Sequence, residues 1–321
     1  MSELASIGAA LGGADFVQGP GGNASIKSGD LLDVKASGSR LRDVSDPSAR
    51  SRVSVALTRA ALSGDAAAER ALLAARPRPS LEVYFHALGP RAVVHTHPLG
   101  ALLVACAAGR DAPSVPGAPL RVVAYARPGA ALAARVRDAL GDHPGDAVVL
   151  LRSHGLIVYA RDASRAVSLT RAFDALCRAR FGDPAPLDAR VARYRSAAAR
   201  EVPGGLALAV PSGPSTPERA LFPDAAVFCP VLLVPSLQPL AEVAAAALAA
   251  APRAAVLTDG ARRVVVAPSA RALDFAVEVL AAHDALEEAL GGDASPLPPD
   301  EARATANLPA ERHRLLRAAE G

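Results

Sequence analysis

The 321-residue chain is 51% hydrophobic and 21% charged, with a formal net charge of +3 at pH 7, so a sizeable buried core in one large and one smaller domain is expected. The small net charge and the scarcity of aromatic residues (seven Phe, four Tyr, no Trp) argue against nucleic acid as a partner. No apolar stretch of about 20 residues predicts a membrane span, and three scattered cysteines predict no disulfide framework, which fits a reducing cytoplasm.

The N-terminal segment combines a short helix with two loops of small residues. Residues 2–11 are expected to form the helix, and the glycine-rich stretch 18–27 runs into a strand whose hairpin partner is 31–35. A second small-residue loop follows at 36–39. Glycines let backbone N–H groups approach an anion, so the paired loops could hold a phosphate, although such loops are more often plain turns.

A helix with an acidic first turn is expected next. Residues 50–75 have a helical composition, and two prolines at 77 and 79 end that helix. Ser80 is expected to cap a new helix in which Glu82 and His86 share a face. Glu82 then lies near the positive end of the helix dipole, where a carboxylate is kept ionised.

Two histidines follow the next apolar run, after a short turn at 89–91. Residues 92–94 predict a strand, on which side chains two apart point to the same face. His95 and His97 are therefore expected to project side by side, and two neutral imidazoles supply half of a metal site. If the preceding helix packs antiparallel to this strand, Glu82 can reach the same metal.

The rest of the first domain alternates helices and strands, and one strand ends near a third histidine. His154 would complete a set of three imidazoles, although a histidine at a strand end before glycine is commonly structural. Helices are expected at 99–108, 130–140 and 163–180, and strands at 120–125, 146–154 and 156–159.

The C-terminal part is expected to form a small α+β unit. Its elements are strands at 226–228, 255–257 and 264–266 and helices at 240–250 and 270–290. Residues 182–216, rich in proline, glycine, serine and alanine, are expected to be mostly connection. The expected boundaries are 201–217 for a linker, 218–292 for the α+β unit and 293–321 for a tail, and the family resemblance given next assigns residues 1–200 to a catalytic domain.

Six short motifs, taken in order, carry a resemblance to a known family: Gly21-Gly22-Asn23, Lys35-Ala36-Ser37-Gly38, Ser80-Leu81-Glu82, His95-Thr96-His97, Tyr125-Ala126 and Ser153-His154-Gly155. The chain resembles the class II aldolase and adducin family, most closely the aldolase portion of bacterial fusions of rhamnulose-phosphate aldolase with alcohol dehydrogenase. The resemblance implies a three-layer α/β/α domain with a central mixed, largely antiparallel sheet over about residues 1–200, followed by the small α+β unit.

The resemblance assigns a role to each matching residue. Glu82 is expected both to bind the metal and to move a proton to and from the reacting carbon, and Tyr125 to act as acid or base on the aldehyde oxygen. Zinc is the expected metal, with manganese or cobalt as alternatives. Lys27 or Lys35 could add charge, because Leu81 replaces a serine found in fuculose-phosphate aldolases. The expected metal ligands are Glu82, His95, His97 and His154, and the expected phosphate-binding residues are Asn23, Ser37, Gly38 and Ser80.

The activity implied is that of an aldehyde-lyase of carbohydrate metabolism. It would cleave a ketose 1-phosphate, similar to rhamnulose or fuculose phosphate, into dihydroxyacetone phosphate and an aldehyde through a metal-stabilised enediolate. Epimerases, dehydratases and decarboxylases of sugar phosphates on the same scaffold are alternatives, as is a non-catalytic adducin-like interaction module. The resemblance also implies a cytoplasmic homotetramer whose partner is a small phosphorylated sugar.

Overall fold

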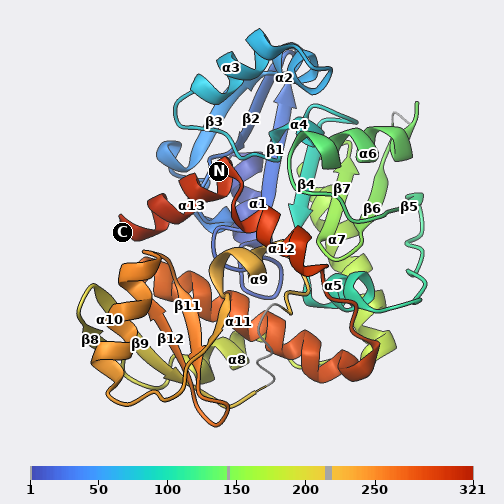
Figure 1. Ribbon diagram of the computed structural model, residues 1–321. Coiled ribbons are helices and arrows are strands. Elements are labelled where there is room, and N and C mark those ends of the chain that lie inside the picture. Colours follow the sequence, from blue (N-terminus) through green and yellow to red (C-terminus); the bar gives the residue numbers. More distant parts are fainter. Residues whose placement is uncertain (1, 143–144, 214–218, 321) are drawn as a thin grey trace. The chain divides into compact units, whose positions relative to one another are not determined.

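The computed structural model describes residues 2–142, 145–213 and 219–320, and the chain divides after Pro184 into two compact units. Figure 1 traces the chain through both. Residues 214–217 of the predicted linker and residue 218, the predicted start of the α+β unit, lie outside the described residues. Among the described residues, no helix is long and apolar enough to cross a membrane.

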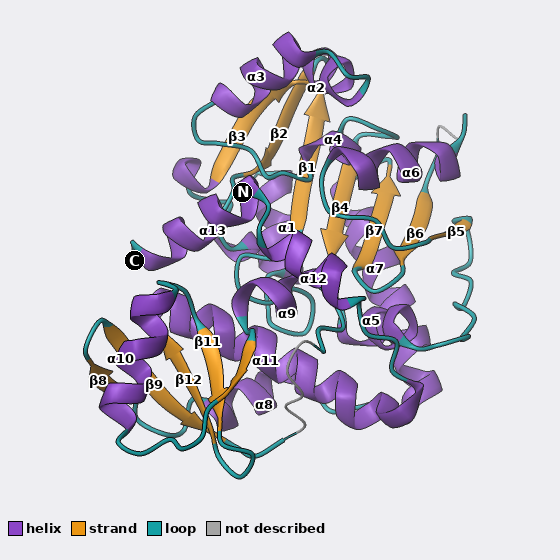
Figure 2. Cartoon of the chain, viewed as in Figure 1, coloured by secondary structure: helices purple, strands orange, loops and turns teal. Residues whose placement is uncertain are grey.

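A seven-stranded sheet forms the middle layer of the first unit (Figure 2). Every neighbouring pair of strands is antiparallel except β5 and β6, so the sheet is mixed and largely antiparallel, as predicted. In spatial order the strands are β3 (Arg50–Ser54), β2 (Leu31–Lys35), β1 (Asn23–Ser28), β4 (Ala92–Thr96), β7 (Gly155–Ala160), β6 (Ala147–Leu151) and β5 (Leu120–Val123).

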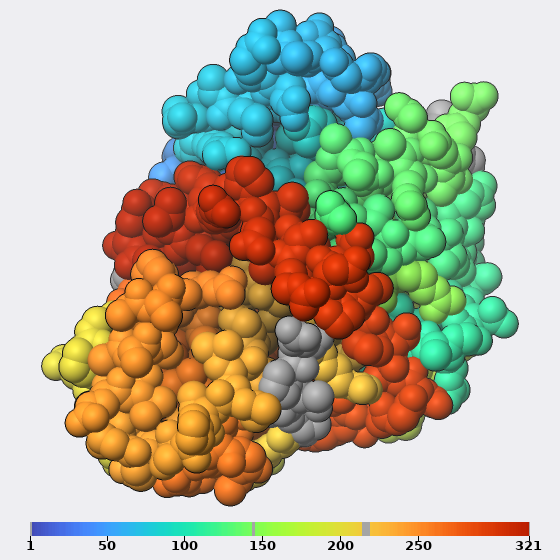
Figure 3. Space-filling view, viewed as in Figure 1, coloured from blue at the N-terminus to red at the C-terminus, as the bar shows by residue number. Residues whose placement is uncertain are grey.

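Helices cover both faces of this sheet and complete the predicted three-layer α/β/α arrangement. One face packs on α1 (Glu3–Leu11), α5 (Leu99–Cys106) and α7 (Ala163–Arg178) through a buried apolar cluster. A second cluster on the other face includes residues of α2 (Val55–Leu62), α3 (Ala66–Ala74), α4 (Val83–His86) and α6 (Ala130–Leu140). The space-filling view shows α2 and α3 on the outer surface of this unit (Figure 3).

Two expectations for the first unit need correction. Residues 50–54 form β3 rather than the start of a helix, because they pair with β2 over five residues, and the helical remainder is divided at Asp65, which caps α3. Ser80 does not cap a long helix: α4 is a single turn, and its N-cap position is Glu82. The extended segment before α4 pairs instead with the loop after β2, through a bridge between Ala36 and Pro79.

The second unit contains a five-stranded sheet with helices packed around it. Strands β10 and β11 are parallel and the other pairs are antiparallel. The sheet order is β10 (Val231–Leu233), β11 (Ala255–Thr258), β12 (Arg263–Ala267), β9 (Gly205–Val210) and β8 (Arg200–Val202). The helices are α8 (Leu187–Tyr194), α9 (Pro223–Phe228), α10 (Leu240–Ala250), α11 (Ala270–Leu290), α12 (Pro299–Ala306) and α13 (Pro309–Ala319).

Three segments of this unit differ from the sequence-based expectation. Residues 223–228 form a helix rather than a strand, and Pro223 occupies its first turn, where a proline costs no hydrogen bond. Residues 187–210, expected as connection, contain α8, β8 and β9, and β9 joins the sheet beside β12. The expected tail from 293 contains α12 and α13, each starting with a proline.

A buried ion pair links the sheet of the second unit to its longest helix. The Arg263 guanidinium in β12 donates from both Nη atoms to Asp284 in α11, at 3.1 and 2.6 Å, and the Tyr194 hydroxyl donates to the same carboxylate at 2.5 Å. Arg263 and Asp284 are 3% and 0% exposed. Loss of one partner would leave a desolvated charge.

We therefore expect Asp284→Ala to lower the free energy of unfolding by about 3–5 kcal/mol. The matched control is Glu320→Ala, which removes an exposed ion pair with Arg317 and should cost about 0–1 kcal/mol. Urea unfolding followed by circular dichroism measures both. Equal costs for the two variants would contradict the stabilising role assigned to the buried pair.

Candidate metal centre and anion loops

Two of the three clustered histidines come from one strand end. His95 lies in β4 and His97 directly follows its last residue, so the two side chains share a face of the sheet. Their Nε2 atoms are 3.1 Å apart, and both residues are buried. The Phe85 ring of α4 packs edge-on against His95, with ring centroids 5.4 Å apart, and fixes the plane of that imidazole.

A backbone carbonyl determines which nitrogen of His95 is available. The Nδ1 atom lies 2.9 Å from the carbonyl oxygen of Leu156 in the neighbouring strand β7. A carbonyl only accepts hydrogen bonds, so Nδ1 carries the proton and Nε2 presents a lone pair. This is the arrangement typical of metal-bound histidines, whose second nitrogen donates to an oxygen atom of the protein.

The turn between β6 and β7 brings the third histidine to the same place. Ser153 adopts a left-handed conformation with φ of 51°, and the His154 N–H donates to the carbonyl oxygen of Leu151. A Cβ atom on Gly155 would lie 2.7 Å from the Thr96 oxygen and 2.8 Å from the His97 ring. Glycine therefore lets this turn approach the strand end that carries the other two histidines.

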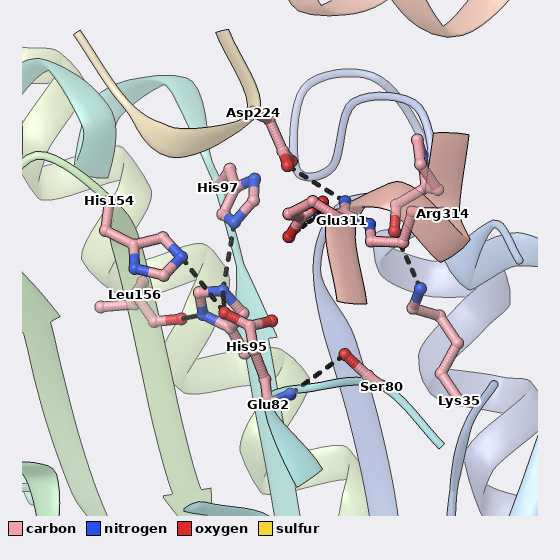
Figure 4. A network of polar contacts seen from close by, with 11 residues as sticks. Lys35, Ser80, Glu82, His95, His97, His154, Leu156, Asp224, Glu311 and Arg314 are labelled. Carbon is pink, nitrogen blue, oxygen red and sulfur yellow. Dashed lines mark hydrogen bonds and ion pairs between the residues drawn. The ribbon is translucent and has the colours of Figure 1, made fainter. Parts of the chain in front are cut away.

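Glu82 completes the cluster from the segment before α4. Its Oε1 atom is 3.5 Å from Nε2 of His95 and 3.3 Å from Nε2 of His154, and Figure 4 shows these side chains converging. Burial disfavours the charged carboxylate, but positive charge on the imidazoles of His95 and His154, which arises when their Nε2 atoms are also protonated, holds the pKa of Glu82 well below its usual 4.5. The carboxylate is therefore ionised at neutral pH.

The donor set fits a divalent metal ion. The three histidines can each offer one nitrogen, and these atoms lie within 4.8 Å of one another. Tetrahedral ligands at about 2.0–2.1 Å from zinc are about 3.3–3.4 Å apart, close to the 3.1, 3.3 and 3.5 Å separations among these imidazole nitrogens and the Glu82 oxygen. Three imidazoles and one carboxylate suit zinc and are also compatible with manganese or cobalt.

Strand pairing and hydrogen bonds connect Asn23, Ser37 and Ser80 to the segments that carry this cluster. Asn23 pairs with His95 in the register of β1 and β4 and is 1% exposed. The Ser37 N–H donates to the carbonyl oxygen of Arg78, which joins the 36–39 loop to the segment before Glu82. Within that loop, Gly38 adopts a φ of 78°. The Ser80 hydroxyl accepts from the Glu82 N–H at 3.3 Å.

Both lysines donate hydrogen bonds to backbone carbonyl oxygens. Lys35 is 1% exposed, and its Nζ atom donates to the carbonyl oxygens of Pro20 and Ser39 at 2.9 and 2.8 Å. It therefore joins the glycine-rich loop to the 36–39 loop. Lys27 donates to the carbonyl oxygens of Leu88, Gly89 and Pro90, in the turn between α4 and β4.

We expect Lys35→Met to weaken binding of inorganic phosphate by about tenfold, because the two loops lose their shared donor. The substitution should also lower the free energy of unfolding by about 1–3 kcal/mol, because two carbonyl oxygens lose their hydrogen-bond donor. Titration calorimetry with phosphate and urea unfolding measure these effects. Lys27→Met is the matched control: it should lower stability similarly and leave phosphate binding unchanged. An equal loss of phosphate affinity in both variants would count against a specific role for Lys35.

Tyr125 and His86 lie outside the histidine cluster. Tyr125 is partly exposed in the loop after β5, and its carbonyl oxygen accepts a hydrogen bond from Arg135. Its role as acid or base stays a prediction. The His86 Nδ1 atom lies 2.8 Å from the Ser25 hydroxyl, and burial lowers the pKa of His86 well below 6.5. His86 is therefore a neutral, buried residue beside the site.

Sequence reasoning did not assign roles to several residues that shape the site. Gln18 is fully buried and donates to the carbonyl oxygens of Ala14 and His97, so it links the glycine-rich loop to the histidine strand. The Leu156 carbonyl and the Phe85 ring orient His95, as described above. An apolar residue or a backbone carbonyl carries no sequence signal for such a role, whereas a buried glutamine beside a glycine loop offers a weak one.

Comparison with known proteins identifies the family. The family model for the class II aldolase and adducin N-terminal domain matches residues 2–181. The chain belongs to the class II aldolase and adducin family.

One curated protein and two solved structures illustrate the range of relatives. The chain is 34% identical over 86 residues to the uncharacterized oxidoreductase YuxG of Bacillus subtilis (strain 168), a match that covers 26% of this chain and 12% of that protein. The N-terminal class II aldolase domain of a conserved protein from Thermoplasma acidophilum is 25% identical, with a TM-score of 0.46 over 55% of this chain and 91% of that one. YgbL from Escherichia coli, described as a putative aldolase/epimerase/decarboxylase, is 22% identical, with a TM-score of 0.44 over 56% and 86%.

Proposed function

We propose that the first unit is a metal-dependent aldehyde-lyase that cleaves a ketose 1-phosphate, similar to rhamnulose or fuculose phosphate, into dihydroxyacetone phosphate and an aldehyde. The observation that carries this proposal is the convergence of three buried imidazoles and Glu82 beside two glycine-containing loops. Membership of the class II aldolase and adducin family supports the same reaction type.

His95, His97, His154 and Glu82 would hold the metal, for which zinc is the first candidate. When bound, a divalent cation polarises the carbonyl and neighbouring hydroxyl oxygens of a ketose and stabilises the negative charge that develops there. The hydrogen bond from His95 Nδ1 to the Leu156 carbonyl leaves Nε2 as the nitrogen of His95 that would hold the cation.

Glu82 and Tyr125 would move the protons. Breaking the carbon–carbon bond requires removal of a proton from the hydroxyl group that becomes the aldehyde oxygen, and the phenolate oxygen of Tyr125, deprotonated beforehand, is the proposed acceptor. The carbon left on the dihydroxyacetone phosphate half then needs a proton, which Glu82 would deliver after its carboxylate has taken one up from water. In the reverse direction, Glu82 is the base, and the low pKa of its carboxylate keeps it ionised for this step.

Asn23, Ser37, Gly38 and Ser80 would bind the substrate phosphate. Gly38 adopts a left-handed backbone conformation, and loops of this kind direct N–H groups at anions. Through the Lys35 side chain the glycine-rich loop and the 36–39 loop are held together before substrate arrives. Such preorganisation lowers the entropy cost of binding.

The assay is incubation of zinc-, manganese- or cobalt-loaded protein with rhamnulose 1-phosphate and fuculose 1-phosphate. Released dihydroxyacetone phosphate is measured by its NADH-dependent reduction with glycerol-phosphate dehydrogenase. We expect product from at least one sugar with metal and none after chelation. Turnover to an isomeric sugar phosphate, a dehydrated sugar or carbon dioxide would replace the lyase with one of the related reactions. A protein that cannot be loaded with metal would favour an adducin-like interaction module.

We also infer from the family resemblance that the protein is a cytoplasmic homotetramer. Its three cysteines are free and buried, which fits a reducing compartment. Light scattering on the purified protein measures the oligomeric state, and a monomeric mass would contradict the tetramer.

A further inference from the structure

The second unit contains a cavity of about 200 Å³ that is separate from the histidine cluster of the first unit. Helix α9 packs against both α11 and α12 (Figure 1). These three helices line the cavity together with the start of β10. Most of the lining is apolar, and its apolar residues include Ala225, Ala226, Val231, Leu232, Leu280 and Ala302.

The charged side chains that line the cavity are all cationic. Arg219, Arg253 and Arg303 line it, and no aspartate or glutamate is among its lining residues in the described part of the chain. Arg219 is neutralised by Glu287, whose carboxylate lies 2.8 Å away. The electrostatic potential inside therefore favours an anion.

Arg253 is the cation that a ligand can neutralise. It follows α10 in the turn before β11, and within the described ranges no carboxylate lies within ion-pair distance of its guanidinium. Burial alone lowers the pKa of Arg253, which shows that its guanidinium is partly removed from water without a compensating charge. A planar carboxylate matches the forked donors of a guanidinium and would supply that charge.

The size of the cavity limits the ligand. An apolar cavity of about 150 Å³ is large enough to hold benzene. A volume of about 200 Å³ therefore has room for one ring or a short branched chain together with a carboxylate. We propose that the second unit binds a small organic carboxylate with an apolar body, whose carboxylate pairs with Arg253 and whose body lies against α9, α11 and α12.

The experiment uses the full-length protein with a chelator present, so that carboxylates are not captured by a metal in the first unit. Calorimetric titration compares benzoate and hexanoate with benzamide and hexanamide, which have the same shape without the charge, and with inorganic phosphate. We expect at least one carboxylate to bind ten or more times more tightly than its amide, and phosphate to bind no better than the amides.

Three variants locate the site. Arg253→Gln should weaken carboxylate binding at least tenfold. Arg253→Lys should weaken it less, because lysine keeps the positive charge although it lacks the two parallel donors of the guanidinium. Ala226→Phe, at a half-buried position of α9, should fill the cavity and abolish binding. Arg317→Gln is the control, because Arg317 is an exposed arginine of the same unit that does not line the cavity. This variant should bind carboxylates with the same affinity as the unmodified protein.

Circular dichroism checks that each variant is folded, and the two Arg253 variants test the proposal even if Ala226→Phe does not fold. Failure of both carboxylates to bind would overturn it, as would undiminished binding by Arg253→Gln. Phosphate bound as tightly as benzoate, and lost in Arg253→Gln, would replace the carboxylate by a phosphate ligand. Since the titrations need no turnover, these results are independent of the proposed lyase activity.

Discussion

Glu82→Gln is expected to lower kcat by about 10²–10⁴-fold while the protein still binds its metal. Glutamine has the shape of glutamate but cannot take up or deliver a proton, and the three imidazoles remain to hold the cation. The measurements are kcat with a ketose 1-phosphate, bound metal per chain, and exchange of the carbon-bound proton of dihydroxyacetone phosphate with deuterium oxide. The variant should lose proton exchange as well as turnover, because both require proton transfer at the same carbon.

Glu69→Gln is the matched control for this variant. Glu69 is a carboxylate of the same unit that accepts a hydrogen bond from the Tyr84 hydroxyl and lies outside the histidine cluster. Its kcat and exchange rate should equal those of the unmodified protein. If Glu82→Gln keeps normal proton exchange, Glu82 does not carry the proton and serves the metal alone.

His154→Ala is expected to lower metal affinity by more than about 100-fold, beyond the 10–100-fold typical when only a hydrogen-bond partner of a ligand is lost. His154 is the one imidazole of the cluster that comes from the β6–β7 turn, and the side chains of its neighbours on β4 cannot replace it. Activity should fall in parallel with the amount of bound metal. Competition with a chromogenic chelator measures the affinity, and circular dichroism verifies the fold.

His86→Gln separates the loss of a ligand from the loss of any buried histidine. His86 contacts Ser25 instead of the clustered nitrogens, so this variant should lose stability and retain metal. Loss of metal in both variants to the same degree would mean that general destabilisation, and not ligation, explains the effect. Normal metal affinity in His154→Ala would remove His154 from the ligand set.

Local sequence patterns predicted part of this site. The two-residue period of a strand placed His95 and His97 on one face, and β4 has the expected position. The approach of His154 depends on a tight turn between neighbouring strands that local periodicity does not describe. The approach of Glu82 to the histidines depends on the extended segment before α4, which pairs with the loop after β2. For these two residues, the local sequence offered only a possible approach to the metal, and the order of motifs shared with the family assigned them as ligands.

Local patterns were less reliable where tertiary pairing decides the structure. Residues 50–54 were expected to be helical, but β2 offers them a strand to pair with. Conversely, the apolar residues 226–228 suggest a strand although Pro223 marks a helix start. The same proline signal at Pro299 and Pro309 marks two helices in the segment expected to be a tail. The three-layer architecture of the first unit was nevertheless predicted correctly, because the resemblance to the class II aldolase and adducin family implied it.

Because Lys35 is buried, its chemical modification can be used to measure the opening of the two loops in the unlabelled protein. The chain has only two lysines, so an amine-directed reagent has few targets, and Lys35 is 1% exposed between two carbonyl oxygens. Acylation at that side chain can proceed only when the glycine-rich loop and the 36–39 loop separate. The rate of modification at Lys35, followed by mass spectrometry, would therefore give the free energy of that local opening without any engineered label.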